Sequence, residues 1–408
     1  MSSSVLNEKI EFQSRTGATL AGRLDRPVGT PRAWALFAHC FTCSKDIPAA
    51  GRIARALAAR GIAVLRFDFT GLGSSEGDFA NTDFSSNVDD LVAAARHLRE
   101  HHGPARLLVG HSLGGAAVLV AAGRLEEVEA VATIAAPADT GHLRELLGAG
   151  AARIEEQGVG EIDIGGRPFT IRRELFEDLD AHRLGEELGA LRRALLVLHS
   201  PVDEIVGIDH AERIYRAARG FKSFVSLADA DHLLSRRRDA EYAGEVLAAW
   251  AGRYLELDAA ADVEAREGQV LVEELERPYT NRVVARGHGL WADEPRSVPG
   301  AHDAGPTPYE LLLAGLGACT SMTLRMYADR KGWPLERVRV HLDHDRIHAA
   351  DCASCETEEG KVDRITTAVE IVGPELDGEQ RARLLEIAER CPVHRTLIGE
   401  KEMVTREA

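Results

Sequence analysis

The chain has 408 residues, of which 45% are hydrophobic, and it carries a formal net charge of −16 at pH 7. Its length predicts two or three domains, and the acidic balance argues against non-specific binding to nucleic acid or to an anionic membrane surface. No apolar run reaches the length needed to cross a bilayer, and the first residues lack the basic and apolar regions of a secretory signal. Six cysteines in so long a chain do not form a secreted disulfide framework. We therefore expect a cytoplasmic protein without a membrane span.

The first two-thirds of the chain alternates between strand and helix patterns. The expected strands are residues 9–14, 18–23, 33–38, 63–67, 106–109, 128–134, 194–199 and 224–227. The expected helices include one that ends at Arg60 and others at 87–99, 116–124, 209–219 and 240–255. This alternation predicts an α/β fold, a mostly parallel sheet covered on both faces, with a ligand site at the carboxyl ends of its strands. Between about residues 138 and 191 helical pieces flank a hairpin pattern, which predicts a small cap over that edge.

One motif lies between an expected strand and an expected helix, in the run Gly110-His111-Ser112-Leu113-Gly114. A G-x-S-x-G sequence in this context is typical of a nucleophile elbow, a sharp turn that leaves no room for side chains at its glycines. Such a turn lifts the serine hydroxyl clear of the sheet, and the following helix directs the positive end of its dipole toward a developing oxyanion. Ser112 is therefore the predicted nucleophile.

A serine hydroxyl needs a histidine to remove its proton and an acid to orient that histidine. In this sheet topology the expected chain order is serine, acid, histidine. Asp203 follows the strand that ends at His199, and His232 follows the last strand of the sheet. Both positions fall in loops at the same sheet edge as Ser112, so the three residues form a predicted catalytic triad.

Residues 1 to about 256 thus resemble the α/β-hydrolase family, especially its small esterases. The matching motifs are His39-Cys40-Phe41, the glycine-rich run from Asp68 to Gly77, the elbow at Ser112, Asp203 and His232. The resemblance implies an oxyanion hole formed by the N–H groups of Phe41 and Leu113. It also implies hydrolysis of a small or medium carboxylic ester.

The run after the third strand departs from the family pattern, because Cys40 stands where the family usually has glycine. Cys40 also forms a C-x-x-C pair with Cys43. Two interpretations stay open from the residues: a redox switch or half a metal site beside the hydrolase centre, or two packed small residues.

A second domain is expected from residue 268 to 408, after a linker at 257–267 that is rich in Ala, Asp and Glu. Its expected strands are 268–276, 281–286, 338–345, 361–372 and 400–405, and its expected helices are 309–330 and 378–390. The first helix has little polar face, which predicts burial in a core or at a subunit interface.

Cys319 in that helix and Cys391 near the end of the chain could be two unrelated core thiols. However, residues from about 268 onward resemble the OsmC/Ohr family of thiol-dependent hydroperoxide reductases, through the run from Thr307 to Thr320 and the run from Cys391 to Leu397. The resemblance implies an α+β domain in which Cys319 attacks a hydroperoxide and becomes a sulfenic acid. Cys391 then condenses with it to a disulfide, which an external dithiol reduces. It also implies an intertwined homodimer.

One element of that family pattern is displaced, and one further cluster invites a metal. Better-studied members place a glutamate ten positions before the reactive cysteine; that position is Tyr309 here, with Glu310 next to it. A zinc site could be sought among His341, His344, His348, Asp351, Cys352 and Cys355. Because His341 and His344 are three positions apart on a strand, they face opposite sides and cannot easily share a metal. A plain loop is favoured there over a redox pair, and we expect neither metal nor cofactor.

The sequence therefore predicts a bifunctional enzyme, a serine esterase fused to a thiol peroxidase that dimerises through its C-terminal domain. Its expected partners are an acyl ester, an organic hydroperoxide and a dithiol reductant. The main alternative is an esterase whose second domain serves only for dimerisation or redox sensing, and a further alternative is a non-catalytic redox-sensing scaffold.

Overall fold

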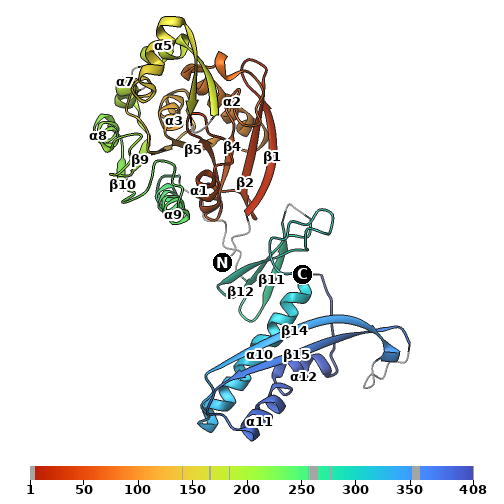
Figure 1. Ribbon diagram of the computed structural model, residues 1–408. Helices are drawn as coiled ribbons and strands as arrows, with labels where there is room; N and C mark the ends of the chain where they lie inside the picture. The colour runs from red at the N-terminus through yellow and green to blue at the C-terminus, as the bar shows by residue number, and fades with distance from the viewer. Residues whose placement is uncertain are drawn as a thin grey trace. The chain divides into compact units, whose positions relative to one another are not determined.

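The computed structural model describes residues 5–139, 141–164, 167–182, 184–255, 257, 265–275, 278–351 and 359–407. The chain divides into two compact units, Met1–Ala265 and Arg266–Ala408 (Figure 1).

The first unit is built on an eight-stranded sheet in the order β1-β2-β4-β3-β5-β6-β9-β10. Its strands are β1 Val5–Gln13, β2 Thr19–Pro27, β3 Ala33–Ala38, β4 Ile62–Phe67, β5 Ala105–His111, β6 Ala130–Ile134, β9 Ala194–His199 and β10 Lys222–Ser226. Neighbouring strands among β4, β3, β5, β6, β9 and β10 pair in parallel, whereas β1 and β2 add an antiparallel edge. Every residue of β4, β6 and β9 is buried, as expected for parallel strands covered on both faces. The predicted mostly parallel α/β sheet is confirmed.

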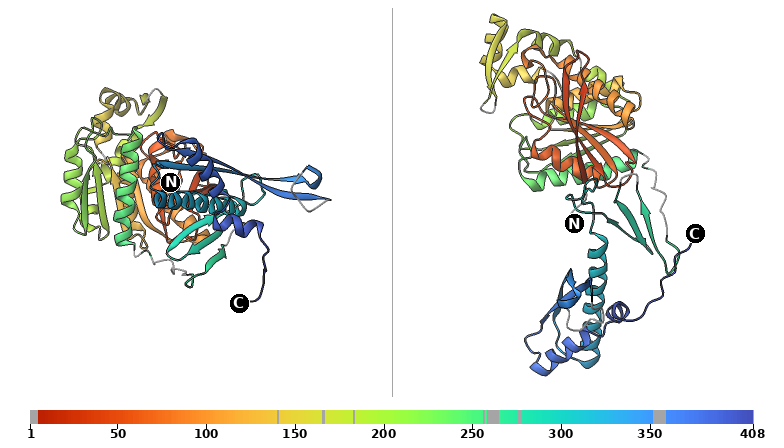
Figure 2. Two further views of the ribbon diagram at one scale, coloured as in Figure 1. Left: turned by 90° about the horizontal axis from the view of Figure 1, so that it is seen from below. Right: turned by 90° about the vertical axis from the view of Figure 1, so that its right-hand side faces the viewer.

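Helices cover both faces of this sheet (Figure 2). Successive side chains of a strand point to opposite faces, so Leu65 and Phe67 of β4 enter one core cluster while Ile62 and Val64 enter the other. The first core is completed by α2 Phe84–His101, α3 Leu113–Arg124 and α8 Ile208–Ala217, and the second by α1 Pro48–Ala58 and α9 Arg237–Tyr254.

A cap is inserted between β6 and β9. It consists of α4 His142–Leu147, α5 Ala149–Gln157, the antiparallel hairpin β7 Val159–Ile164 and β8 Arg167–Arg172, α6 Arg173–Ala181 and α7 Leu184–Ala190. The hairpin contacts the 3₁₀ turn η1 Phe79–Asn81 through Phe169, whose ring centroid lies 5.2 Å from that of Phe79. The cap therefore packs on the segment that follows the glycine-rich run.

In the residues that the structure describes, the second unit contains a three-stranded sheet, a long hairpin and three α-helices. The sheet is β11 Val270–Glu274, β12 Asn281–Ala285 and β13 His288–Ala292, and the hairpin is β14 Arg337–His348 with β15 Lys361–Val372. The helices are α10 Pro308–Lys331, α11 Gly378–Ala388 and α12 Pro392–Ile398. Its small core joins Leu324 and Ala328 of α10 to Leu384 of α11.

One expectation for this unit is wrong, and two of its elements were not expected. Residues 400–405 form no strand, and their apolar side chains Met403 and Val404 are 90% and 76% exposed. The strand β13 and the helix α12 were not predicted. The strand β13 is one short hairpin arm, and the helix α12 has fewer than two turns, so neither gives a clear sequence pattern. Within its own chain α10 is buried only in part, since Leu324 and Ala328 are buried whereas Met322 and Met326 are 65% and 72% exposed. The expected subunit interface stays a prediction.

A further correction concerns the expectation that no apolar run is long enough to cross a bilayer. By length and composition, α10 passes the test for a helix that could cross a bilayer, and 28% of its most apolar window is buried within the chain. Core helices of soluble proteins and signal sequences pass the same test, so this is weak evidence for a membrane span.

Candidate functional site

Ser112 lies in a strained turn between β5 and α3. Its backbone has φ 54° and ψ −126°, a conformation that is rare for any residue with a side chain and that persists only where the surroundings impose it. The N–H of Ser112 donates to Ile134 O over 2.8 Å, and its carbonyl accepts from the N–H of Gly115 over 2.8 Å. These bonds fix the elbow that the sequence motif predicts.

The two motif glycines are required by close backbone contacts. A Cβ on Gly110 would lie 2.3 Å from Gly114 O, and a Cβ on Gly114 would lie 2.4 Å from His39 O. The second contact matters for function, because it packs the start of α3 directly against the loop that follows β3. The elbow and that loop are therefore held together without an intervening side chain.

The three residues predicted as a triad come together at the carboxyl edge of the sheet. His232 Nε2 lies 3.0 Å from Ser112 Oγ, and His232 Nδ1 lies 2.8 Å from Asp203 Oδ2. The other carboxylate oxygen of Asp203 accepts from the N–H groups of Ile205 and Val206 over 2.9 and 3.0 Å. An acid that orients a histidine whose other nitrogen faces a serine can activate that serine as a nucleophile.

Electrostatics favour an ionised acid in this arrangement. Burial raises the pKa of the Asp203 carboxyl, but the hydrogen bonds from His232 and from the N–H groups of Val206 and Ile205 outweigh it and hold that pKa below its usual value. Asp203 therefore remains a carboxylate near neutral pH, as the orienting role requires.

Two further histidines support the triad, and the sequence interpretation gave neither a role. His111 Nε2 donates to the backbone carbonyl of His232 over 2.7 Å, and burial lowers the pKa of His111 to about 4. His199 Nε2 donates to Val206 O over 2.7 Å and lies 3.8 Å from Asp203 Oδ2, and burial lowers its pKa too. The sequence feature that could have pointed to them is their position at the ends of the strands β5 and β9, which lead to Ser112 and Asp203.

Phe41 and Leu113, the predicted oxyanion donors, both line one pocket. Within the described part of the chain, neither N–H donates to another backbone or side-chain group. The pocket is lined mainly by apolar groups, from His39, Cys40, Phe41, Phe69, Leu72, Phe79, Asn87, Leu113, Gly114 and Ala117.

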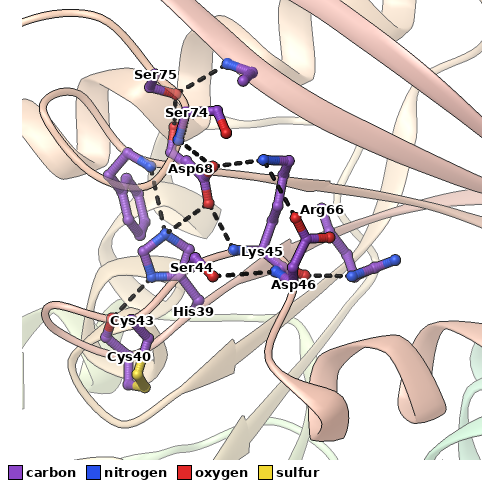
Figure 3. Close-up of polar contacts among 12 residues, drawn as sticks. His39, Cys40, Cys43, Ser44, Lys45, Asp46, Arg66, Asp68, Ser74 and Ser75 are labelled. Atoms are coloured by element: carbon purple, nitrogen blue, oxygen red, sulfur yellow. Dashed lines mark hydrogen bonds and ion pairs between the residues drawn. A yellow bond between two sulfur atoms is a disulfide. The ribbon is translucent and has the colours of Figure 1, made fainter.

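A buried ion pair anchors the loop that carries Phe41 (Figure 3). Asp68 accepts from both the backbone N–H and the Nζ of Lys45 over 2.6 Å, and from the N–H of Ser74 over 2.9 Å. Arg66 donates to Asp25 over 2.7 Å and also to the carbonyl of Lys45. Buried ion pairs add little net stability, yet they fix geometry when their hydrogen bonds are satisfied. Here they hold Lys45, four residues beyond Phe41, the predicted oxyanion donor.

Cys40 and Cys43 form a disulfide within this loop (Figure 3). The sequence left open a redox switch or half a metal site, or two packed small residues. The disulfide removes the free thiolates that a metal site would need, and it leaves the other two interpretations open. Cys40 is buried, whereas Cys43 is partly exposed.

In the second unit, Cys319 lies on α10 and Cys391 caps the N-terminus of α12, and both are free thiols. Cys391 is fully buried; its Sγ accepts from the N–H of His394 over 3.3 Å and lies 3.5 Å from Thr320 Oγ1. Because Thr320 is the neighbour of Cys319, the turn of α10 that carries one cysteine packs on the other.

Glu310 and Tyr309, which lie where the related family has a glutamate before its reactive cysteine, make other contacts. Glu310 accepts from the N–H of Thr307, whose hydroxyl accepts from the N–H of Glu310, so this carboxylate caps α10. Tyr309 is 54% exposed and stacks on His344, with ring centroids 4.4 Å apart. Cys352 and Cys355 lie outside the described residues. Among those described, no three His, Cys, Asp or Glu side chains form a group that could hold a metal.

Comparisons with known proteins address the two units separately. Residues 30–155 match the family model described as serine aminopeptidase S33, and residues 300–405 match the model described as OsmC-like protein. The esterase domain of a Rhodothermus marinus protein is 49% identical, covers 61% of this chain and 99% of its own, and gives a TM-score of 0.52.

More distant relatives agree on the fold of the first unit. A putative hydrolase from Agrobacterium vitis S4 is 24% identical over 60% of this chain and 98% of its own, with a TM-score of 0.50. Mouse alpha/beta hydrolase domain-containing protein 10 is 20% identical over 60% of this chain and 99% of its own, with a TM-score of 0.52. The uncharacterized protein YfhR of Escherichia coli K12 is 26% identical over 233 residues, which are 55% of this chain and 73% of that protein.

Proposed function

The chain belongs to the α/β-hydrolase family and carries a fused OsmC-like domain, and we propose that its first unit is a serine esterase. The observation that carries this proposal is the unbroken hydrogen-bonded series from Ser112 Oγ through His232 to Asp203, with contacts of 3.0 and 2.8 Å. The 49% identity to an esterase domain from Rhodothermus marinus supports an ester as the substrate.

The mechanism follows from the contacts of each group. His232 Nε2 takes the proton of Ser112 Oγ as this oxygen attacks the ester carbonyl, and Asp203 stabilises the imidazolium that forms. The N–H groups of Phe41 and Leu113 donate to the oxyanion, a contribution worth about 10²–10³ in turnover for each donor. His232 then protonates the leaving alcohol, and water hydrolyses the acyl-enzyme by the same proton transfers in reverse.

The pocket beside the oxyanion donors favours a small or medium acyl chain. Its walls include Phe41, Leu72 and Phe79, with few polar groups, so it suits an apolar chain better than the charged amine of an aminopeptidase substrate. The ring of Phe169 in the cap packs edge-on against Phe79, which in turn packs on Phe41 with ring centroids 5.4 Å apart. The cap therefore sets the depth of the pocket.

Hydrolysis of p-nitrophenyl esters of increasing chain length tests this proposal. We expect turnover on acetate to hexanoate esters, its loss in Ser112→Ala, and covalent labelling of Ser112 by a fluorophosphonate probe. An intact, folded protein that neither hydrolyses these esters nor reacts with the probe would leave the non-catalytic scaffold as the better interpretation.

For the second unit we propose thiol-dependent reduction of organic hydroperoxides. The Cys319 thiolate attacks the O–O bond and releases an alcohol, leaving a sulfenic acid; Cys391 condenses with it, releasing water and forming a disulfide; an external dithiol restores both thiols. The packing of Cys391 against the turn of α10 that carries Cys319 supports the pairing.

One observation favours the alternative that this unit only dimerises or senses redox state. Glu310 caps its own helix and Tyr309 stacks on His344, so neither is positioned to assist Cys319. Consumption of cumene hydroperoxide with a dithiol, compared between Cys43→Ser and the double variant Cys43→Ser/Cys319→Ser, separates the two, because neither protein keeps the Cys40–Cys43 pair. Turnover that vanishes in the double variant supports the peroxidase, and no turnover with several dithiols supports the alternative.

We also propose that the protein acts in the cytoplasm as a homodimer through this unit. The apolar side chains that α10 leaves exposed, Tyr309, Leu312, Met322 and Met326, provide a surface for a second copy.

A further inference from the structure

We propose that the Cys40–Cys43 pair is a thiol–disulfide exchange site that controls the turnover of Ser112. With the disulfide closed, the loop holds the N–H of Phe41 ready for the oxyanion, and when a dithiol opens the disulfide, turnover falls. This inference rests on the esterase activity proposed above. It assigns a redox site to the hydrolase unit, at which dithiols and hydroperoxides react.

The disulfide encloses the oxyanion donor. Phe41 and Thr42 are the only residues between the two cysteines, and the N–H of Cys43 donates to Cys40 O over 3.1 Å, which closes a tight turn. The carbonyl of Cys40 also accepts from His39 Nδ1 over 2.8 Å. Any change in this turn therefore acts directly on the peptide that presents the N–H of Phe41.

The turn contains a residue that does not suit it. Thr42 has φ 62°, at the third position of a turn where positive φ normally requires glycine or asparagine. A β-branched residue in this conformation is strained and stays there only when its surroundings enforce it. The disulfide across the turn supplies that constraint, so its opening lets Thr42 relax to negative φ and moves the neighbouring peptide.

The flanks of the loop remain fixed whichever form the disulfide takes. His39 Nε2 accepts from the N–H of Phe69 over 3.4 Å, and Lys45 is tied to Asp68 through its backbone and its side chain (Figure 3). A cross-link over so few residues also restricts the unfolded chain less than one that closes a long loop. The disulfide is thus better placed to set the local geometry of the turn than the stability of the fold.

The two sulfur atoms differ in access, which gives the exchange a direction. Cys40 is 4% exposed, whereas Cys43 is partly exposed. The thiolate of an external dithiol attacks Cys43 Sγ, Cys40 leaves as a thiolate that takes up a proton, and the second thiol of the reductant releases Cys43 and becomes the external disulfide. In the reverse direction Cys43 reduces an organic hydroperoxide to its alcohol and becomes a sulfenic acid, and Cys40 displaces water from it to restore the disulfide.

The test measures p-nitrophenyl butyrate hydrolysis by the full chain before and after treatment with a dithiol, with the state of Cys40 and Cys43 followed by alkylation and peptide mass spectrometry. We expect kcat to fall by about tenfold or more on reduction with little change in KM, because an oxyanion donor acts mainly in the transition state. Addition of cumene hydroperoxide should restore it. Cys43→Ser should show the reduced kcat and no response to either reagent, with every other cysteine still present.

Thr42→Gly is the matched variant, because glycine adopts positive φ without strain. We expect it to lose much less kcat on reduction than the intact chain, which an unspecific effect of the dithiol would not produce. Equal kcat in both redox states with complete opening of the disulfide, or full activity in Cys43→Ser, would overturn the proposal. Failure of the esterase itself is distinguishable, because then neither form would hydrolyse the ester or react with a fluorophosphonate. Melting temperatures of each form exclude unfolding as the cause.

Discussion

The imidazole of His111 donates a 2.7 Å hydrogen bond to the backbone carbonyl of His232. This bond joins the residue before the proposed nucleophile to the loop that carries the proposed general base, and the two rings lie 5.2 Å apart. A protonated His111 would place a positive charge in a buried position beside His232, and burial accordingly lowers the pKa of His111 to about 4.

The stability of the first unit should depend on pH through this group. In the folded chain His111 stays neutral down to about pH 4, whereas in the unfolded chain it binds a proton near pH 6.5. Between these values the unfolded state holds more protons, so the free energy of unfolding falls as the pH is lowered, by about 3 kcal/mol in all. Urea unfolding of the intact chain and of His111→Gln at pH 7 and pH 4.5 checks this. The difference between the two proteins should shift in favour of the variant at the lower pH; a pH-independent difference would contradict the assignment.

The elbow should store strain that limits stability. Ser112 has φ 54°, so Ser112→Gly relieves the strain while Ser112→Ala retains it, and both remove the hydroxyl. We expect Ser112→Gly to be more stable than Ser112→Ala by about 1 kcal/mol, because strain at such a position exceeds the entropy that glycine loses on folding. Denaturant unfolding measures this difference. Equal stability of the two inactive variants would mean that the surrounding bonds do not force the turn.

The three residues of the proposed triad could be brought together from the sequence because they follow buried strands. Ser112, Asp203 and His232 each come after an apolar run, and parallel strands bring such positions to one edge. The contacts that His111 and His199 make could not be predicted from the sequence, since a histidine at a strand end gives no sign of which carbonyl it faces. The state of Cys40 and Cys43 was equally out of reach, because pairing depends on the turn geometry around Thr42.

Burial of α10 shows the limit of periodicity. An apolar helix pattern predicts cover without saying whether the cover comes from the same chain. Leu324 and Ala328 are covered by α11, whereas Met322 and Met326 of the same helix are not covered by their own chain. The expected strand at 400–405 failed for a related reason, since alternation alone supplies no neighbouring strand to pair with.

Two glycines of α3 should respond to the same substitution in opposite ways. A Cβ on Gly114 would meet His39 O at 2.4 Å and Ala38 O at 2.6 Å, whereas a Cβ on Gly123 meets nothing within 4 Å. We expect Gly114→Ala to destabilise the chain by about 2 kcal/mol or more and to lower kcat, because it displaces the loop that carries Phe41. Gly123→Ala should be neutral or stabilising by up to about 1 kcal/mol. Thermal unfolding with ester turnover tests both, and a silent Gly114→Ala would contradict the tight packing of elbow and loop.

The exposed face of α10 should determine the oligomeric state. Met322 and Met326 are one helical turn apart, so they lie on the same face and would be buried together against a second copy. A charge placed there would be desolvated at the proposed interface without a partner, so Met326→Glu should convert the proposed dimer to monomer. Met403→Glu is the matched control, because Met403 is 90% exposed and lies outside any helix or strand. Light scattering across a dilution series gives the mass of each variant. If Met326→Glu retains the mass of the intact protein, α10 is not the dimer surface, and its apolar face needs another explanation.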